Sequence, residues 1–245
     1  MNQTVYTLVS TRALTRDVFE LTLSGDTSAI TRPGQFVDLA LDGLFLRRPI
    51  SVCDWECGRL VLILRTVGEG TRALASAEPG ARFDTLSGLG NGYDAATASG
   101  KTPVLIGGGV GVPPLYGLAR RMAASGPAPA VALGFNTGGD VFYADEFRAL
   151  GCEVLLSTVD GSAGDKGFVT DLVRKTDCDY AFCCGPEPML KAVYALPQIS
   201  DGQFSFEARM GCGFGACMGC SCKTKYGAKR ICKDGPVLKK EEIVW

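Results

Sequence analysis

The sequence predicts a small antiparallel β-barrel, then a doubly wound α/β domain, then a short cysteine-rich segment. Three observations support this fold class. Residues 1–98 form short strand-like runs separated by turn signals, residues 99–200 alternate apolar strands with helices, and residues 201–245 hold five of the eleven cysteines. We expect one domain or segment over each of these three ranges. A stretch rich in Gly, Ala, Ser and Thr, residues 90–103, joins the first two.

The barrel is predicted from six runs that are β-branched or alternate between apolar and polar residues. They cover residues 4–14, 17–25, 35–41, 48–55, 59–67 and 81–89. Regular spacing of short strands with turns between them is typical of a small barrel. The sequence GTRALASAEPG, at 70–80, predicts a short helix between the last two strands.

The second domain is predicted from strands that alternate with helices, the pattern of a parallel sheet covered on both faces. The expected strands cover residues 102–108, 128–136, 152–160 and 180–186. The expected helices cover residues 113–126, 143–151, 168–176 and 186–196.

Composition excludes several classes of protein. The chain has 25 Lys and Arg against 26 Asp and Glu, which leaves no basic surface for nucleic acid or an anionic membrane. Its opening lacks the basic and apolar regions of a signal peptide, and its longest apolar stretch, TPVLIGGGVGVPPLYGLA, is broken by glycines and a proline pair. We therefore expect no membrane span. Eleven cysteines without an export signal favour the reducing cytoplasm.

The chain contains no histidine. This excludes Cys2His2 zinc sites, Rieske centres, His-ligated haem and any mechanism that depends on a histidine base. The chemistry must come from sulfur, carboxylates, backbone amides or bound cofactors.

The cysteine-rich run MGCGFGACMGCSC, at 210–222, has the spacing C-x4-C-x2-C of plant-type [2Fe–2S] proteins. Its glycines allow left-handed turns and bring backbone N–H groups close to negatively charged sulfur. Zinc sites prefer two C-x2-C pairs, of which one is present, and unliganded or paired thiols are a third reading. Cys222 is too close to Cys220 to serve in the usual loop. The candidate ligands are Cys212, Cys217, Cys220 and Cys232.

Two glycine turns are candidates for binding a nucleotide. VLIGGGVGVPPL does not match the G-x-G-x-x-G fingerprint, but it still places bare amides and a helix N-terminus after a strand. FCCGPEPML does the same further on, and both turns follow strands whose carboxyl ends share one edge of a parallel sheet. A purely structural turn is the alternative for either one alone. The candidates are Gly107, Gly108, Gly109, Gly111, Pro114, Cys184, Gly185 and Pro186.

In the barrel, RRPISV presents Arg48 beside Pro49, which fixes the backbone for a guanidinium to meet a phosphate. Ser51 can donate to a ring nitrogen. An ordinary strand with a surface arginine is the alternative. Arg65, Gly70 and Thr71 form a second candidate phosphate site before the short helix.

With these motifs, the whole chain resembles the ferredoxin reductase family, through RPIS, GGGVGVPP and CGPEPM. The ending EARMGCGFGACMGCSC…RICKDGPVL is similar to the branch of that family that serves dihydroorotate oxidation. The resemblance implies an FAD-binding barrel, an NAD-binding α/β domain and a [2Fe–2S] segment. It implies FAD contacts at Arg48 (pyrophosphate), Pro49, Ile50, Ser51 (flavin N5), Ile63, Leu64, Arg65, Gly70 and Thr71. Ile50 stands where many ferredoxin reductases carry an aromatic side chain that stacks on the flavin.

The resemblance also implies a reaction and a partner. Electrons would pass from dihydroorotate to FMN in a partner subunit, then through the [2Fe–2S] cluster and FAD to NAD+, in pyrimidine biosynthesis. The complex would be a heterotetramer with two copies of each subunit. Cys184 would lie beside the nicotinamide, and the Asp160 carboxylate would repel the 2′-phosphate of NADP.

Two other functions stay open at this point. A related cluster-bearing flavoprotein subunit, of the hydrogenase or ferredoxin-transhydrogenase type, would contain the same parts and differ in partner. A zinc-stabilised nucleotide-binding module would have no redox role. The basic tail, with eight Lys and Arg against five Asp and Glu in residues 201–245, is either a solvated surface or a docking face.

Overall fold

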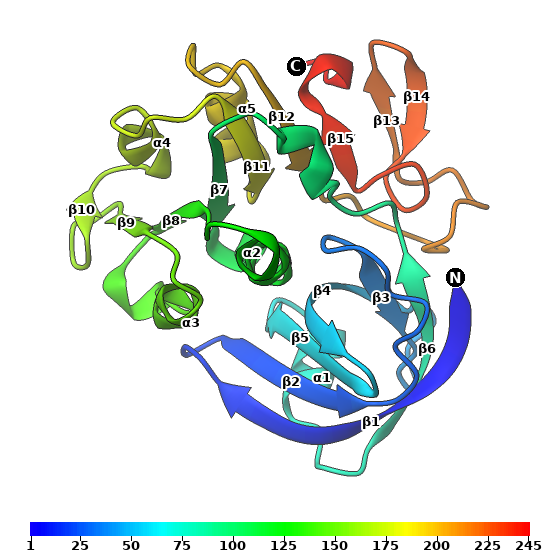
Figure 1. Ribbon diagram of the computed structural model, residues 1–245. Coiled ribbons are helices and arrows are strands. Elements are labelled where there is room, and N and C mark those ends of the chain that lie inside the picture. Colours follow the sequence, from blue (N-terminus) through cyan, green and yellow to red (C-terminus); the bar gives the residue numbers. More distant parts are fainter.

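The computed structural model describes residues 1–245 and contains a closed six-stranded barrel, a seven-stranded sheet and a two-stranded hairpin (Figure 1). This confirms the predicted fold class of a barrel followed by an α/β domain. None of the helices is long and apolar enough to cross a bilayer.

The barrel is antiparallel throughout, with the strand order β1-β2-β5-β4-β3-β6. All six predicted runs are strands: β1 (Asn2–Ala13), β2 (Val18–Ser24), β3 (Phe36–Leu39), β4 (Arg48–Glu56), β5 (Arg59–Arg65) and β6 (Arg82–Leu89). The predicted short helix is α1 (Glu69–Ala75). Leu21, Val37 and Leu62 belong to the buried cluster of thirteen residues that fills the barrel.

The sheet has the order β10-β9-β8-β7-β11-β12-β15 and is parallel except for its last pair. Its strands are β7 (Pro103–Gly108), β8 (Ala130–Phe135), β9 (Val154–Thr158), β10 (Asp165–Lys166), β11 (Tyr180–Cys184), β12 (Asp201–Ser205) and β15 (Val237–Lys239). The four predicted helices are α2 (Pro113–Ser125), α3 (Ala144–Ala149), α4 (Val169–Val173) and α5 (Glu187–Tyr194). Single 3-10 turns are η1 (Ala95–Ala98), η2 (Gly109–Gly111), η3 (Gly138–Asp140) and η4 (Lys240–Glu242).

Two strands of this sheet, β12 and β15, come from the cysteine-rich segment and were not predicted. Each is only a few residues long, so neither shows a recognisable alternation of apolar and polar residues in the sequence. Their pairing places the two ends of the segment on the sheet, with the cysteine loop and the hairpin of β13 (Ser221–Thr224) and β14 (Gly227–Arg230) between them (Figure 1).

The barrel is joined to the α/β domain through β4 and α2. A Cβ on Gly117 of α2 would lie 2.6 Å from the carbonyl oxygen of Cys53, so the helix packs directly on the strand backbone. Arg121 lies over the Trp55 ring at 3.4 Å, and Arg120 pairs with Asp54 at 3.3 Å. The strand that begins with RPIS is therefore fixed against the helix that follows the first glycine turn.

The cysteine segment packs on the outside of the barrel, over β3 and β6. Cys220, Ile231 and Cys232 share one buried cluster with Phe36 of β3 and Leu89 of β6. The backbone amide of Asn91, just after β6, donates to the carbonyl oxygen of Gly235 at 2.7 Å. This packing holds the cysteine loop beside the barrel strands rather than free in solvent.

Candidate cofactor sites

The predicted flavin-phosphate residues meet at the start of β4 and the start of α1. The Arg48 guanidinium lies so close to Gly70 that a Cβ there would be 2.1 Å from its Nε atom. The hydroxyl of Thr71 accepts from the amides of Val67 at 3.0 Å and Gly68 at 3.1 Å, which shapes this turn. The structure thus brings Arg48, Gly70 and Thr71 together, as a shared phosphate site requires.

The other predicted flavin residues lie on β4 and β5 with different orientations. Ile50 and Ser51 are half-buried, so part of β4 faces outward and remains accessible. Leu64 belongs to the barrel core, which leaves only its backbone for a ligand. Ile63 belongs instead to the cluster shared with α2. Arg65 forms an ion pair with Asp17 at 2.6 Å.

The two glycine turns touch each other at the carboxyl edge of the sheet. Gly107 of β7 is paired with Cys184 of β11. A Cβ on Gly111 would lie 2.4 Å from the carbonyl oxygen of Cys184 and 2.6 Å from the Cα of Gly185. A Cβ on Gly108 would likewise meet Pro186 and Met189. The turns thus form one site in which the absence of side chains lets the two backbones approach closely, and Pro114 lies in the first turn of α2 behind it.

Cys184 ends β11 within this site. Burial raises the pKa of its thiol to about 12, so the side chain is neutral at physiological pH and is suited to packing rather than to nucleophilic chemistry. The hydroxyl of nearby Tyr93 donates to the backbone carbonyl oxygen of Cys183 at 3.0 Å.

Asp160 follows β9 at the same carboxyl edge of the sheet. Its carboxylate accepts from the amide of Ser162 at 2.9 Å and from the hydroxyl at 2.6 Å. These hydrogen bonds lower the pKa of Asp160, so it carries a negative charge at neutral pH. Ser162 in turn accepts from the amide of Gly138, after β8, at 2.6 Å, which fixes the carboxylate relative to the neighbouring strand.

The four candidate cluster ligands are arranged as two pairs. The amide of Cys217 donates to the Sγ of Cys212, and the amide of Cys232 donates to the Sγ of Cys220, both at 3.4 Å. No three His, Cys, Asp or Glu side chains converge as a group that could hold a single metal ion. Two thiolates for each of two irons is the ligand arrangement that a [2Fe–2S] cluster needs.

Backbone amides and glycines surround these sulfur atoms. The Sγ of Cys212 accepts from the amides of Ala216 at 3.2 Å and Cys217 at 3.4 Å. Although burial opposes it, hydrogen bonds from backbone amides lower the pKa of Cys212 to about 6. A Cβ on Gly211 would lie 3.3 Å from the Sγ of Cys217. The chemistry of the donor set and the amides around it fit an anionic iron–sulfur cluster.

The pairs differ in exposure, since Cys212 is half-buried and Cys217 exposed, whereas Cys220 and Cys232 are buried. One side of a bound cluster would therefore face the surface. Cys222 lies on β13, where it pairs with Lys229, and it takes no part in either pair.

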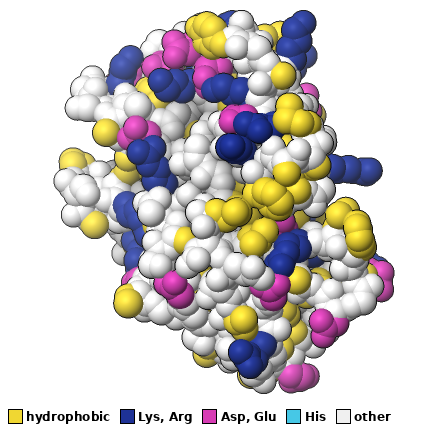
Figure 2. All heavy atoms as spheres, turned by 90° about the vertical axis from the view of Figure 1, so that its right-hand side faces the viewer, with side chains coloured by type: hydrophobic (Ala, Val, Ile, Leu, Met, Phe, Trp, Pro, Cys, Tyr) yellow, Lys and Arg dark blue, Asp and Glu magenta, His cyan; other side chains and the backbone are white.

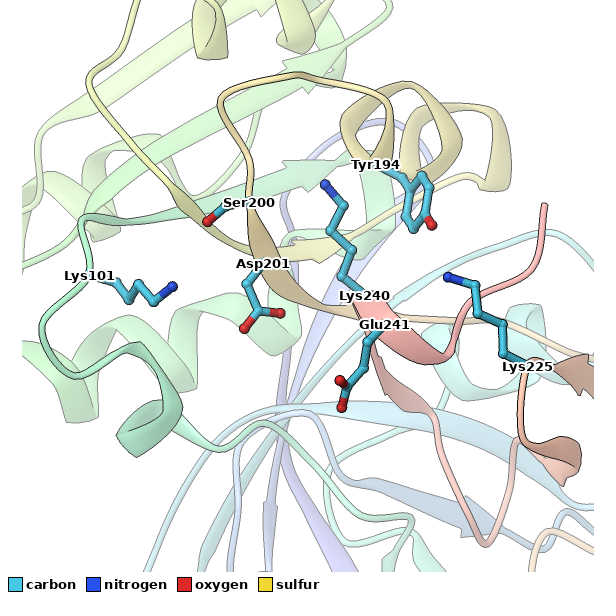
Figure 3. Close-up of a pocket in the computed structure, with 7 residues that line it drawn as sticks. All are labelled: Lys101, Tyr194, Ser200, Asp201, Lys225, Lys240 and Glu241. Carbon is cyan, nitrogen blue, oxygen red and sulfur yellow. The ribbon is translucent and has the colours of Figure 1, made fainter.

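Two hollows lie far from these turns, at the amino ends of the parallel strands. One, of about 450 Å³, lies at the start of β12 and is drawn in Figure 3. It is lined by Lys101, Tyr194, Ser200, Asp201, Lys225, Lys240 and Glu241. Its Lys240 already bonds to the carbonyl oxygen of Ile199 and lies over the Tyr194 ring. The other hollow, of about 800 Å³, is lined by residues such as Thr102, Pro103 and Ala130. Ligands of open α/β sheets bind at the opposite, carboxyl edge.

Sequence reasoning missed Asp38, which lies on β3 beneath the cysteine loop. A Cβ on Gly213 would be 2.3 Å from its Oδ2 atom. The available signal was a single acidic residue within the otherwise apolar run QFVDLAL.

Comparison with known proteins gives a consistent result. Residues 207–244 match the iron–sulfur cluster binding domain of dihydroorotate dehydrogenase B, and residues 105–195 match the oxidoreductase NAD-binding domain. The chain is 41% identical over 99% of its length to the dihydroorotate dehydrogenase B (NAD+) electron transfer subunit of Bacillus pumilus (strain SAFR-032), covering 98% of that protein. It is 44% identical over 97% of its length to the subunit of the same name from Geobacillus thermodenitrificans (strain NG80-2), covering 97% of it.

Among solved structures, the chain resembles one described as the NADH-dependent reduced ferredoxin-NADP oxidoreductase, with a TM-score of 0.85 and 29% identity. That match covers 98% of this chain and 90% of the other. A ferredoxin NADP+ reductase from Neisseria gonorrhoeae with bound FAD and NADP, at 15% identity and a TM-score of 0.68, shares the fold; the match covers 79% of this chain and 89% of that one.

Proposed function

Because this chain belongs to the family of dihydroorotate dehydrogenase B (NAD+) electron-transfer subunits, we propose that it carries electrons from a dihydroorotate-oxidising partner to NAD+. Electrons pass through a [2Fe–2S] cluster and FAD on this chain, in pyrimidine biosynthesis. The chain is thus the NAD-linked, iron–sulfur flavoprotein part of an oxidoreductase that forms orotate.

The observation that best supports this proposal is the placement of the three candidate sites relative to one another. The cysteine loop packs on β3, β3 pairs with the flavin strand β4, and β4 packs on α2, which begins at the glycine turns. A cluster, a flavin and a nicotinamide bound at these places would be neighbours in that order. This is the order that the reaction requires.

Each group of residues has one task in this proposal. Cys212, Cys217, Cys220 and Cys232 hold the cluster. Arg48, with Gly70 and Thr71, binds the FAD pyrophosphate, and Ser51 donates to the flavin ring. The glycine turns orient the nicotinamide nucleotide, with the neutral Cys184 thiol packed beside its ring. When bound, FAD exchanges two electrons with NAD+ and one at a time with the cluster. The protein supplies orientation, which explains how the chain functions without histidine.

The partner in this proposal is an FMN-containing catalytic subunit, in a complex with two copies of each chain. It would cover the cysteine loop, where Phe214 and Met218 are exposed, 44% and 53% respectively. Figure 2 shows hydrophobic side chains in a band on the right-hand side of the molecule, with Lys and Arg beside them. We place the complex in the cytoplasm, where the eleven free cysteines would stay reduced.

Reconstitution with the catalytic subunit tests the partner assignment. The two purified subunits together are expected to reduce NAD+ with dihydroorotate, and the mass of the complex is expected to equal two copies of each. The chain alone is expected to show no oxidation of dihydroorotate. Oxidation by the chain alone, or no NAD+ reduction by the fully loaded mixture, would contradict the assignment.

The charge of Asp160 predicts the choice of coenzyme. Asp160→Asn keeps the acceptor for Ser162 but removes the negative charge that would repel a 2′-phosphate. At about 4 Å such a repulsion costs about 1–2 kcal/mol in water, so kcat/KM for NADPH is expected to rise about tenfold while NADH changes little. Asp165→Asn, a neutralisation on the exposed strand β10, is the control. Comparable use of NADPH by the unmodified chain would refute this role.

The structural likeness to the NADH-dependent reduced ferredoxin-NADP oxidoreductase favours a second candidate, a subunit of that type. The two differ in the electron donor of the complex. Reduction of the chain by reduced ferredoxin and NADPH, but not by dihydroorotate with its catalytic subunit, would favour this second candidate. The identities of 41–44% over nearly the whole chain support the first.

A further inference from the structure

Asp38 on β3 is a buried carboxylate without a hydrogen-bond partner at Oδ1. The residue is 2% exposed. Asp54 on β4 is nearly as buried, but its carboxylate pairs with Arg120 and Arg121. Burying a carboxylate without such a partner costs free energy, because water no longer solvates the charge. Burial of Asp38 therefore destabilises the fold, and no bond to its Oδ1 atom offsets this effect.

The carboxylate lies between the flavin strand and the cysteine loop. Val37 and Leu39 belong to the barrel core, so their neighbour Asp38 points outward, under the C-terminal segment. Across the ladder Asp38 is paired with Pro49 of the RPIS motif. On its other side Oδ2 is so close to Gly213 that a Cβ there would be 2.3 Å away. Gly213 directly follows the candidate ligand Cys212.

The positive charges near Asp38 are not paired with its carboxylate. Arg47 donates to the backbone carbonyl oxygen of Asp38 at 3.3 Å, while its ion pair, at 2.6 Å, is with Asp84. Burial raises the pKa of Asp38 to about 6, although the charges of Arg47 and Arg48 oppose the rise. The carboxylate thus faces the cysteine loop without a countercharge bonded to it.

We propose that Asp38 is a further functional residue of the electron-transfer reaction, whose negative charge holds down the reduction potential of the cluster. This inference rests on the proposed function. When the cluster is reduced it gains one electron and its negative charge increases by one, so a fixed negative charge nearby destabilises the reduced form. The opposite step, in which one electron leaves the cluster for the flavin, becomes more favourable. Asp38 thereby favours electron flow toward NAD+.

The test is the potential of the cluster in Asp38→Asn, measured in the full chain with both cofactors by an EPR-monitored redox titration at pH 8. Asparagine keeps the shape and removes the charge. At the midpoint potential of the unmodified chain, Asp38→Asn is expected to hold about ten times more reduced than oxidised cluster. This corresponds to a rise of about 59 mV in the midpoint potential of a one-electron couple. Asp42→Asn removes the same charge from the exposed turn after β3 and is expected to leave the potential unchanged.

A second variant tests the same electrostatic effect by removing a positive charge instead of a negative one. Arg47→Gln removes a positive charge beside Asp38 and is expected to lower the potential, and it decides the matter if Asp38→Asn does not hold a cluster. An unshifted cluster potential in a fully loaded Asp38→Asn, or a higher potential in Arg47→Gln, would overturn the role of Asp38. Either result would leave the proposed function unaffected. A chain that never binds a cluster would instead overturn the proposed function and this inference with it.

Discussion

Replacing Cys220 by alanine is expected to remove the iron–sulfur cluster and to leave reduction of the flavin by NADH intact. Cys220 lies in the buried pair with Cys232, so solvent has little access to the position of its thiolate. The barrel and the sheet have their own cores and do not depend on this sulfur. Iron content and the EPR signal of the cluster should fall close to zero, and electron transfer from the catalytic subunit should fall with them.

The matched control is Cys222→Ala, two residues along, where the thiol belongs to neither pair. It is expected to keep iron content, the EPR signal and electron transfer. Loss of the cluster in Cys222→Ala with retention in Cys220→Ala would show that the ligand set is wrong.

Gly111→Ala is expected to disable the nicotinamide site. The added Cβ would lie 2.4 Å from the carbonyl oxygen of Cys184 and 2.6 Å from the Cα of Gly185. Both atoms are backbone and cannot rotate away, so the two glycine turns must separate. A displacement of about 1 Å in such a site can cost about a hundredfold in rate. We therefore expect kcat/KM for flavin reduction by NADH to fall about a hundredfold, measured by stopped-flow absorption.

Gly126→Ala is the control for this variant, since Gly126 ends α2 with no atom within 4 Å of an added Cβ. It is expected to react with NADH at the normal rate. Both variants should retain FAD and the cluster, because those sites lie on other elements. Normal NADH kinetics in Gly111→Ala would contradict the placement of the nicotinamide between the two turns.

Much of the fold was predictable because its signals are local. The six barrel runs and the strand–helix alternation each carry their own period, and the two glycine turns were expected to meet because parallel strands end at one edge. The spacing of Cys212, Cys217 and Cys220 identified the cluster loop for the same reason.

The missed features depend on contacts between segments that are remote in the sequence. β12 and β15 are strands because they pair with the sheet and with each other, and their short sequences alone do not show it. The position of Asp38 beneath Gly213 follows from packing the C-terminal segment on β3, across 175 residues of chain. No pattern within a single segment reports such a contact.

The central claim, that one chain carries a nicotinamide site, FAD and a [2Fe–2S] cluster in electronic contact, is tested most directly by anaerobic titration of the purified chain with NADH. Absorption and EPR spectra are recorded after each addition. The account predicts bleaching of the flavin band followed by the EPR signal of a reduced [2Fe–2S] cluster. A spectrum without flavin or iron–sulfur features after cofactor-preserving purification, together with zinc in the metal analysis, would contradict it.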